Sequence, residues 1–195
     1  LVSIVRMMNH LPKVIVFDAF GTLVKIKTGR SPYRKLMRWL KENGRAPQPD
    51  DAKFIMSNNV NIKQLTELFG YIIPLPLWSE IEDDLRDDLQ TIELYEDTIS
   101  TLQNLKNRGY KLALCSNLAR YYGEQLKKLI PDLFDLIVLS YEVGHIKPEQ
   151  QIYAMIETHF KCDMKEMLFI GDHPVLDVEK PISLGMNARI INRHQ

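Results

Sequence analysis

A continuous apolar run from Val14 to Phe17 ends directly in Asp18 and is followed by Gly21 and Thr22. Such a run of β-branched and aromatic residues, closed by turn-forming residues, predicts a buried strand of a parallel sheet. Ligands bind outside the carboxyl ends of the strands in such sheets, so the Asp18 carboxylate is expected at a ligand site. An isolated Asp-x-x-Gly more often only opens a turn, so the rest of the chain has to decide between the two interpretations.

From residue 97 onward the sequence alternates between helical and strand patterns. Helical segments with an apolar stripe separate short apolar runs, which predicts a parallel sheet covered by helices on both faces. The expected fold class is therefore α/β, with a Rossmann-like parallel sheet. Its remaining strands are expected at residues 110–115, 134–139, 167–170 and 188–191.

Residues 25–93, called the helical block below, show helical periodicity and no strand signal. Ser31 and Pro32 suit the N-cap and the first turn of its first helix. The last helix, expected from about Leu77, carries an acidic run that we interpret as a solvated face rather than a metal site. This run comprises Glu82, Asp83, Asp84, Asp87 and Asp88.

The domain organisation follows from this change of pattern. Residues 11–24 and 94–195 are expected to form the α/β core, with the helical block inserted as a small all-helical domain. We interpret residues 1–10 as a leader or an artificial remnant and give them no functional role.

Charge and cysteine content exclude several classes of function. The 195 residues include 25 basic and 25 acidic ones, for a net charge of +0, so neither nucleic acid nor an anionic membrane is an expected partner. Apolar runs stay well below the roughly 20 residues that a membrane span needs. Cys115 and Cys162 are too few for a disulfide framework, which favours a reducing cytoplasm.

Polar side chains lie at or after the carboxyl ends of four predicted strands. Because the carboxyl ends of neighbouring parallel strands meet in one crevice, these side chains are expected to converge. Each has a plain alternative as a turn residue, and Asp177 suits the N-cap of a following helix equally well. The converging residues are Asp18, Thr22, Ser116, Asn117, Lys147, Asp172 and Asp177.

In this order the motifs resemble those of the haloacid dehalogenase-like (HAD) hydrolase superfamily. The resemblance covers nearly all of residues 14–191 and implies a HAD-like core, with the helical block as its cap domain. The matching motifs are Asp18-Ala19-Phe20-Gly21-Thr22, Ser116-Asn117, Lys147-Pro148 and Gly171-Asp172 with Asp177.

The resemblance implies a hydrolase, most directly a Mg²⁺-dependent phosphatase acting on a small phosphorylated metabolite. Asp18 is then the nucleophile that forms an aspartyl-phosphate, and Lys147 is the second catalytic residue, offsetting negative charge. Mg²⁺ is implied at Asp18, Asp172 and Asp177 together with the backbone carbonyl of Phe20. A monomer or a homodimer is expected.

Three further side chains, Thr22, Ser116 and Asn117, are implied as the groups that bind the substrate phosphate. Donors placed around the equatorial oxygens supply most of the catalysis in phosphoryl transfer.

Phe20 departs from the pattern of the phosphatases in this superfamily, which usually carry a second aspartate there as general acid and base. An aromatic residue at this place resembles the 2-haloacid dehalogenases, whose leaving group needs no proton. The intact Gly171-Asp172 pair opposes that alternative, since it is metal-site chemistry. A catalytically silent member that binds a phosphorylated metabolite or a protein is a third interpretation.

Two histidines, His145 and His173, are candidates for a substitute acid, because an imidazole titrates near pH 6.5. Their closeness to the motifs in sequence is the only support for this role. Accidental proximity is therefore the favoured interpretation.

Overall fold

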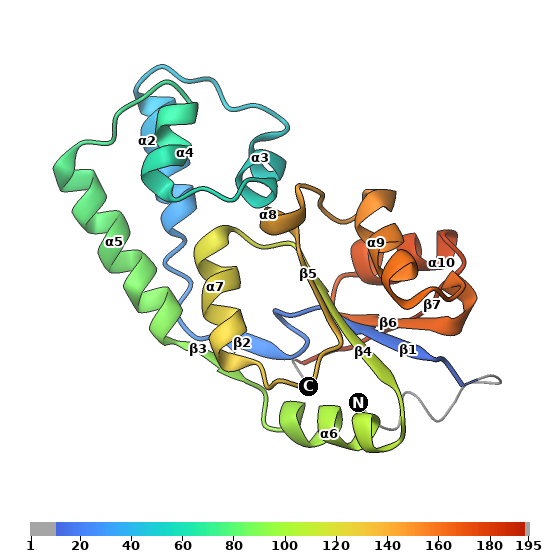
Figure 1. The fold of residues 1–195 in the computed structure, drawn as a ribbon. Helices are drawn as coiled ribbons and strands as arrows, with labels where there is room; N and C mark the ends of the chain where they lie inside the picture. Colours follow the sequence, from blue (N-terminus) through green and yellow to red (C-terminus); the bar gives the residue numbers. More distant parts are fainter. Residues whose placement is uncertain (1–10, 194–195) are drawn as a thin grey trace.

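The computed structural model describes residues 11–193 (Figure 1). Five parallel strands form one sheet in the order β5-β4-β1-β6-β7, so the first strand of the chain lies at its centre. Val16 of β1 is paired with Ala113 on one side and Phe169 on the other. The strands are β1 (Val14–Phe17), β4 (Lys111–Ser116), β5 (Leu136–Leu139), β6 (Met167–Gly171) and β7 (Asn187–Ile190).

Side chains of the central strand alternate between two hydrophobic cores, as the pleat of a strand requires. Ile15 and Phe17 belong to one core, while Val14 and Val16 belong to the other. Helices α6 (Thr98–Asn107) and α7 (Arg120–Leu129) supply the first core, and α9 (Gln150–Phe160) supplies the second. The predicted α/β sheet with helices on both faces is therefore confirmed.

Short helical segments fill the remaining connections of the sheet. Residues 140–143, expected as a loop, form a helix of one turn, and the helix expected at residues 178–184 begins earlier as a π-helical turn. These segments are α8 (Ser140–Val143), η1 (Met164–Glu166), η2 (Pro174–Glu179) and α10 (Lys180–Ser183).

The helical block has a strand at each of its ends. Strands β2 (Val24–Ile26) and β3 (Ile92–Leu94) pair antiparallel, and Val24 lies opposite Leu94. The prediction of a block without strands is therefore wrong at both ends. Three-residue strands are too short to produce a recognisable alternation, and their pairing partner is distant in sequence.

Between these two strands the chain forms four helices with a core of their own. In Figure 1 they lie at one end of the molecule, and α3 packs on α8 while α5 packs on α7. The helices are α2 (Pro32–Glu42), α3 (Asp51–Ser57), α4 (Ile62–Leu68) and α5 (Leu75–Gln90). The buried residues of this core are Leu36, Leu40, Ile62, Leu65, Ile81 and Leu85.

The acidic run on α5 is exposed at Glu82, Asp83 and Asp87, as predicted, but Asp88 is buried. Its carboxylate accepts hydrogen bonds from the backbone N–H of Arg30 at 2.8 Å and the hydroxyl of Tyr122 at 2.8 Å. The interpretation of Asp88 as a solvated residue is therefore wrong. This side chain joins the end of α5 to the start of α2 and to α7.

Ser31 does not cap α2 through its side chain, contrary to the prediction. Its φ of 58° is left-handed, and its backbone N–H donates to Asp88 Oδ2 at 3.3 Å. The carboxylate of Asp88 thus fixes the backbone just before α2 rather than capping its first turn, and this long-range contact leaves no local sequence signal.

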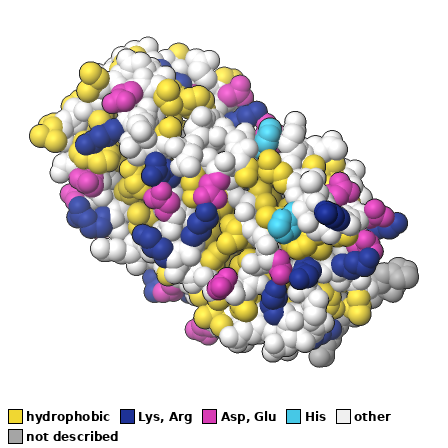
Figure 2. Space-filling model, in the orientation of Figure 1, with side chains coloured by type: hydrophobic (Ala, Val, Ile, Leu, Met, Phe, Trp, Pro, Cys, Tyr) yellow, Lys and Arg dark blue, Asp and Glu magenta, His cyan; other side chains and the backbone are white. Residues whose placement is uncertain are grey.

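Charged side chains of both signs are interspersed over the face drawn in Figure 2, in keeping with the net charge of +0. None of the helices in residues 11–193 is long and apolar enough to cross a membrane. The interpretation of residues 1–10 lies outside the described residues.

Candidate active site

Asp18 follows the central strand directly, and its backbone N–H donates to the carbonyl of Ile170 at 2.9 Å. The residue is buried, with 7% of its surface exposed. Two donors reach the same oxygen, Oδ1: the hydroxyl of Ser116 at 3.0 Å and the ammonium of Lys147 at 2.7 Å. The ends of β1 and β4 and the loop after α8 therefore meet at one carboxylate.

Lys147 is buried between two carboxylates. Its Nζ lies 2.7 Å from Asp18 Oδ1 and 2.6 Å from Asp177 Oδ1. Burial lowers the pKa of this lysine, but the Asp18 and Asp177 carboxylates more than offset that effect, so its pKa is raised. The side chain is a fixed cation at the centre of the cluster.

Asn117 holds the backbone of Lys147 in place. Its Oδ1 accepts from the N–H of Lys147 at 2.7 Å, and its Nδ2 donates to the carbonyl of Lys147 at 2.8 Å. Both ends of the amide are thus engaged with this loop. The side chain positions Lys147, which is a different task from the predicted binding of substrate.

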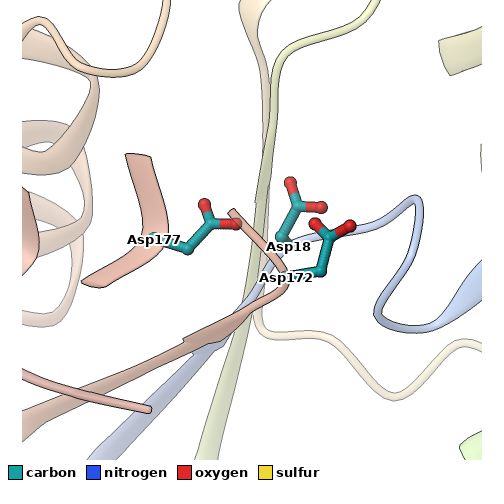
Figure 3. A group of neighbouring side chains, drawn as sticks. All are labelled: Asp18, Asp172 and Asp177. Carbon is teal, nitrogen blue, oxygen red and sulfur yellow. The ribbon is translucent and has the colours of Figure 1, made fainter. Parts of the chain in front are cut away.

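Three carboxylates, those of Asp18, Asp172 and Asp177, lie close together (Figure 3). Oxygen atoms of Asp18, Asp172 and Asp177 lie within 4.8 Å of one another. Burial, followed by the neighbouring Asp177 carboxylate, raises the pKa of Asp172. Asp172 forms no ion pair within residues 11–193, so the cluster holds more negative charge than its one ammonium offsets. A group of oxygen ligands with excess negative charge suits a hard divalent cation.

Asp177 is buried, and both of its oxygens already have partners. Oδ1 accepts from Lys147, and Oδ2 accepts from the backbone N–H of His173 at 3.0 Å. The alternative that Asp177 is an N-cap is wrong, because it lies inside η2 and His173 occupies the capping position. Through Oδ1, Asp177 positions the ammonium of Lys147.

Two glycines make room for these carboxylates. A Cβ on Gly21, which has a φ of +76°, would lie 2.1 Å from Asp172 Oδ2. A Cβ on Gly171 would lie 2.3 Å from Asp177 Oδ2. The sequence predicts only the turn at Gly21. The space that each glycine leaves for a carboxylate depends on how the strands lie side by side.

Thr22 is fully buried, and its hydroxyl has no hydrogen-bond partner among the described residues. Its backbone carbonyl accepts from the guanidinium of Arg193 at 2.7 Å. None of the contacts within residues 11–193 joins its side chain to the carboxylates. The predicted role of Thr22 in binding phosphate therefore has less geometric support than that of Ser116.

The two histidines contact residues that lie close to them in the chain. Nδ1 of His173 accepts from the backbone N–H groups of Val175 at 3.2 Å and Leu176 at 3.3 Å, which caps η2. His145 Nδ1 lies 3.4 Å from a carboxylate oxygen of Glu149. These contacts favour the interpretation of both as structural residues.

Phe20 is partly buried against the first core and contacts Tyr122 edge to face, with 6.3 Å between the ring centroids. Tyr122 in turn lies 6.3 Å from the ring of Tyr33 in α2. An aromatic row thus runs from the loop that carries Asp18 to the helical block. Tyr33 and Tyr122 appear in the sequence only as apolar-face residues of helices, so their place beside the site could not be predicted.

A family model of haloacid dehalogenase-like hydrolases matches residues 12–180. Among curated proteins, pyrophosphatase PpaX of Bacillus cereus is 31% identical over 99 residues, or 49% of this chain. Glyceraldehyde 3-phosphate phosphatase of Methanothermobacter thermautotrophicus is 32% identical over 100 residues, or 50% of this chain. Each match covers 44% of the relative, so the chain spans less than half the length of either.

Solved structures resemble the whole fold. A HAD phosphatase from Thermococcus onnurineus is 26% identical with a TM-score of 0.63, covering 93% of this chain and 87% of that one. A HAD family enzyme from Bacteroides thetaiotaomicron, solved with magnesium and inorganic phosphate, is 18% identical with a TM-score of 0.69. That match covers 94% of this chain and 96% of the other.

Proposed function

The chain belongs to the haloacid dehalogenase-like hydrolases, and we propose that it hydrolyses small phosphate monoesters through a phosphoryl group carried on Asp18. The observation that carries the proposal is the setting of the Asp18 carboxylate at the end of the central strand. Ser116 and Lys147 bind its Oδ1 at 3.0 Å and 2.7 Å. Oδ2 accepts from neither of these two donors.

In the proposed reaction a carboxylate oxygen of Asp18 attacks phosphorus, and the bond from phosphorus to the ester oxygen breaks. The electron pair leaves with that oxygen. A water molecule then attacks the phosphoryl group, the bond to Asp18 breaks, and inorganic phosphate leaves. Covalent catalysis of this kind divides one difficult step into two easier ones.

Lys147 and Ser116 supply donors to the transferring group. The fixed ammonium of Lys147 reduces the repulsion between the Asp18 carboxylate and a phosphate dianion. The hydroxyl of Ser116, 2% exposed, is held beside the same oxygen. Asn117 and Asp177 act through Lys147, since their side chains bind its backbone and its ammonium.

Magnesium fits the donor set of this site. The carboxylates of Asp18 and Asp172, with the backbone carbonyl of Phe20, would hold the ion, and Asp177 would lie behind them on Lys147. When bound, Mg²⁺ supplies Lewis-acid stabilisation of charge on phosphoryl oxygens. The magnesium named with the Bacteroides thetaiotaomicron structure supports this assignment by analogy.

We expect Mg²⁺ to bind the wild-type protein at one site and to bind Asp172→Ala much more weakly. Removing a residue that only hydrogen-bonds to a metal ligand already weakens metal affinity about 10–100-fold. Removing a ligand itself should weaken it at least as much. Titration calorimetry measures this, with Asp83→Ala on the exposed face of α5 as the matched control. Equal binding by wild type and Asp172→Ala would remove Asp172 from the proposed metal site.

Phe20→Asp is expected to raise turnover of alkyl phosphates, which have poor leaving groups. The new carboxyl group would stand where related phosphatases hold their general acid, whose contribution is about 10²–10⁴-fold in rate. For aryl phosphates the gain should be small, because their leaving groups depart with little help. Rates are compared for the two ester classes after thermal unfolding has shown that the variant folds.

Phe20→Asn is the matched control. It removes the same ring, and asparagine has nearly the size of aspartate but offers no acidic proton. A gain in Phe20→Asn as large as that in Phe20→Asp would attribute the effect to lost bulk rather than to proton transfer. No gain in Phe20→Asp on alkyl phosphates would contradict the account of a phosphatase that lacks its acid.

We propose in addition that the helical block acts as a cap over this site. Its four helices lie between β2 and β3 in the chain, and Tyr33 from α2 belongs to the aromatic row that begins at Phe20. Such an insertion can enclose a substrate without interrupting the sheet.

A second candidate function is 2-haloacid dehalogenation, which the aromatic ring of Phe20 favours. Asp18 would then attack carbon and displace halide, a leaving group that needs no proton. Assay of 2-halo acids and phosphate monoesters, each with and without Mg²⁺, separates the two. Metal-dependent release of phosphate supports the first function, and metal-independent release of halide supports the second.

A further inference from the structure

We infer that the preferred substrates are aryl phosphates, whose ester substituent is an uncharged, apolar aromatic ring. This inference rests on the proposed function, since it names the substrate class of the same site. Two independent observations carry it: an apolar cavity between the helical block and the sheet, and the missing proton donor at Phe20.

The cavity has a volume of about 310 Å³. Ligand sites in proteins range from about 300 to 1,000 Å³, so this one suits a leaving group of one or two rings. The helical block lines it from one side and the segment after β4 from the other. Its lining includes Tyr33, Ile55, Met56, Asn117, Leu118 and Tyr122.

None of the described residues that line this cavity carries a charge. The polar side-chain atoms of Asn117 are bound to the backbone of Lys147, and the hydroxyl of Tyr122 is bound to Asp88. What remains for a ligand is aliphatic surface, the faces of aromatic rings and the hydroxyl of Tyr33. A substrate whose ester substituent carries a charge or is strongly hydrated would lose its water there without gaining an ionic partner, which is costly.

Two residues of the cavity wall are linked to the loop of the nucleophile. Asn117, in its wall, is the residue after Ser116, whose hydroxyl binds Asp18. Tyr122, also in its wall, contacts the ring of Phe20, two residues after Asp18. In the proposed complex the phosphoryl group lies at Asp18, and its ester substituent extends toward this cavity.

The second observation concerns the proton that a leaving group needs. Phe20 cannot protonate the departing oxygen. Burial raises the pKa of both tyrosines in the aromatic row, Tyr33 and Tyr122, and the hydrogen bond to Asp88 raises that of Tyr122 further, so both phenols are weak acids. Substrates whose leaving oxygen is a weak base are then favoured. A phenol has a pKa near 10, as in tyrosine, so phenolate leaves far more readily than an alkoxide.

The two observations select the same class by separate routes. The cavity favours an apolar ring, and the missing acid favours a phenolate. The names of the two curated relatives refer to pyrophosphate and glyceraldehyde 3-phosphate. Neither compound has an aromatic ring that could pack against the apolar lining of this cavity. Aromatic contacts with Tyr33 and Tyr122 would add to the burial of a ring.

The experiment compares kcat/KM for five phosphate compounds in the presence of Mg²⁺. Acetyl phosphate has a good leaving group that does not need the cavity, and it reports the chemistry of Asp18 alone. Comparing kcat/KM for benzyl phosphate and glycerol phosphate measures the effect of the cavity alone, because both are alkyl esters. Phenyl phosphate against glyceraldehyde 3-phosphate combines both effects. We expect the aromatic member of each pair to be favoured by at least about tenfold.

Ile55→Asn places a polar group in the cavity wall, and Ile72→Asn makes the same change at a position of the helical block that is 86% exposed. We expect the ratio of kcat/KM for phenyl phosphate over acetyl phosphate to fall about tenfold in the first variant and to stay at the wild-type value in the second. A ratio unchanged in Ile55→Asn would overturn the inference. So would equal rates for benzyl and glycerol phosphate.

A binding measurement separates failure of this inference from failure of the proposed function. Calorimetry should show phenylphosphonate, which is not hydrolysed, binding at least about tenfold more tightly than methylphosphonate. Absence of acetyl phosphate turnover in the wild type would refute the proposed function, whereas equal binding of the two phosphonates would refute the aromatic cavity.

Discussion

Asp18→Asn is expected to lower turnover of acetyl phosphate by about 10³-fold or more, since an amide cannot form the covalent intermediate. The substitution is nearly isosteric and leaves Lys147 paired with Asp177 at 2.6 Å. The fold should therefore persist. Steady-state rates measured on protein whose thermal unfolding remains cooperative test the prediction.

Asp132→Asn is the matched control for this variant. Asp132 is exposed at the start of the segment that leads to β5, so the same chemical change there should leave the rate unchanged. If Asp18→Asn retained more than about a tenth of the wild-type rate, Asp18 could not be the nucleophile.

Lys147→Met is expected to destabilise the protein strongly as well as to remove its activity. The methionine has a similar length but leaves the carboxylates of Asp18 and Asp177 buried without their shared cation. Removal of one partner from a buried ion pair costs about 3–5 kcal/mol of unfolding free energy. Denaturant unfolding measures the loss.

Two further variants test the cause of that destabilisation. Lys111→Met breaks a surface pair with Asp135 and should cost less than about 1 kcal/mol. The double variant Lys147→Met/Asp177→Asn removes one of the stranded charges and should recover part of the loss. A single variant Lys147→Met as stable as Lys111→Met would show that the buried cation contributes little to stability.

The sheet and the polar residues at its edge could be predicted because their signals are local. Each buried strand is a continuous apolar run, and Asp18, Ser116 and Asp172 occupy or directly follow the last residue of one. Parallel strands in one sheet must bring such residues to the same edge. The topology therefore supplied the proximity of residues that lie far apart in the chain.

Features that depend on pairing between distant segments could not be predicted. Strands β2 and β3 have three residues each, and they pair although the four helices of the helical block separate them in the chain. The sequence pattern predicts Asp88 to be one more exposed charge on an acidic helix. In the structure it is buried and accepts hydrogen bonds from Tyr122 and from the backbone of Arg30, just before α2. Neither the pairing nor the burial leaves a periodic pattern in the local sequence.

The roles of Asn117 and Asp177 illustrate the same limit within the site. Sequence motifs identify both residues but cannot tell a group that touches substrate from one that holds a neighbour. Hydrogen bonds of Asn117 to the backbone of Lys147, and of Asp177 to its ammonium, make that distinction. Both are positioning residues in the geometry described above.

The central claim, a phosphoryl group carried on Asp18, is tested most directly by trapping the intermediate. Wild-type protein is mixed with acetyl phosphate and Mg²⁺, quenched in acid within one turnover, digested, and examined by mass spectrometry. The account predicts a peptide heavier by one phosphoryl group, with the modification on Asp18 and absent from Asp18→Asn. Turnover that proceeds with Asp18 unmodified at every quench time, or with the phosphoryl group on another residue, would contradict it.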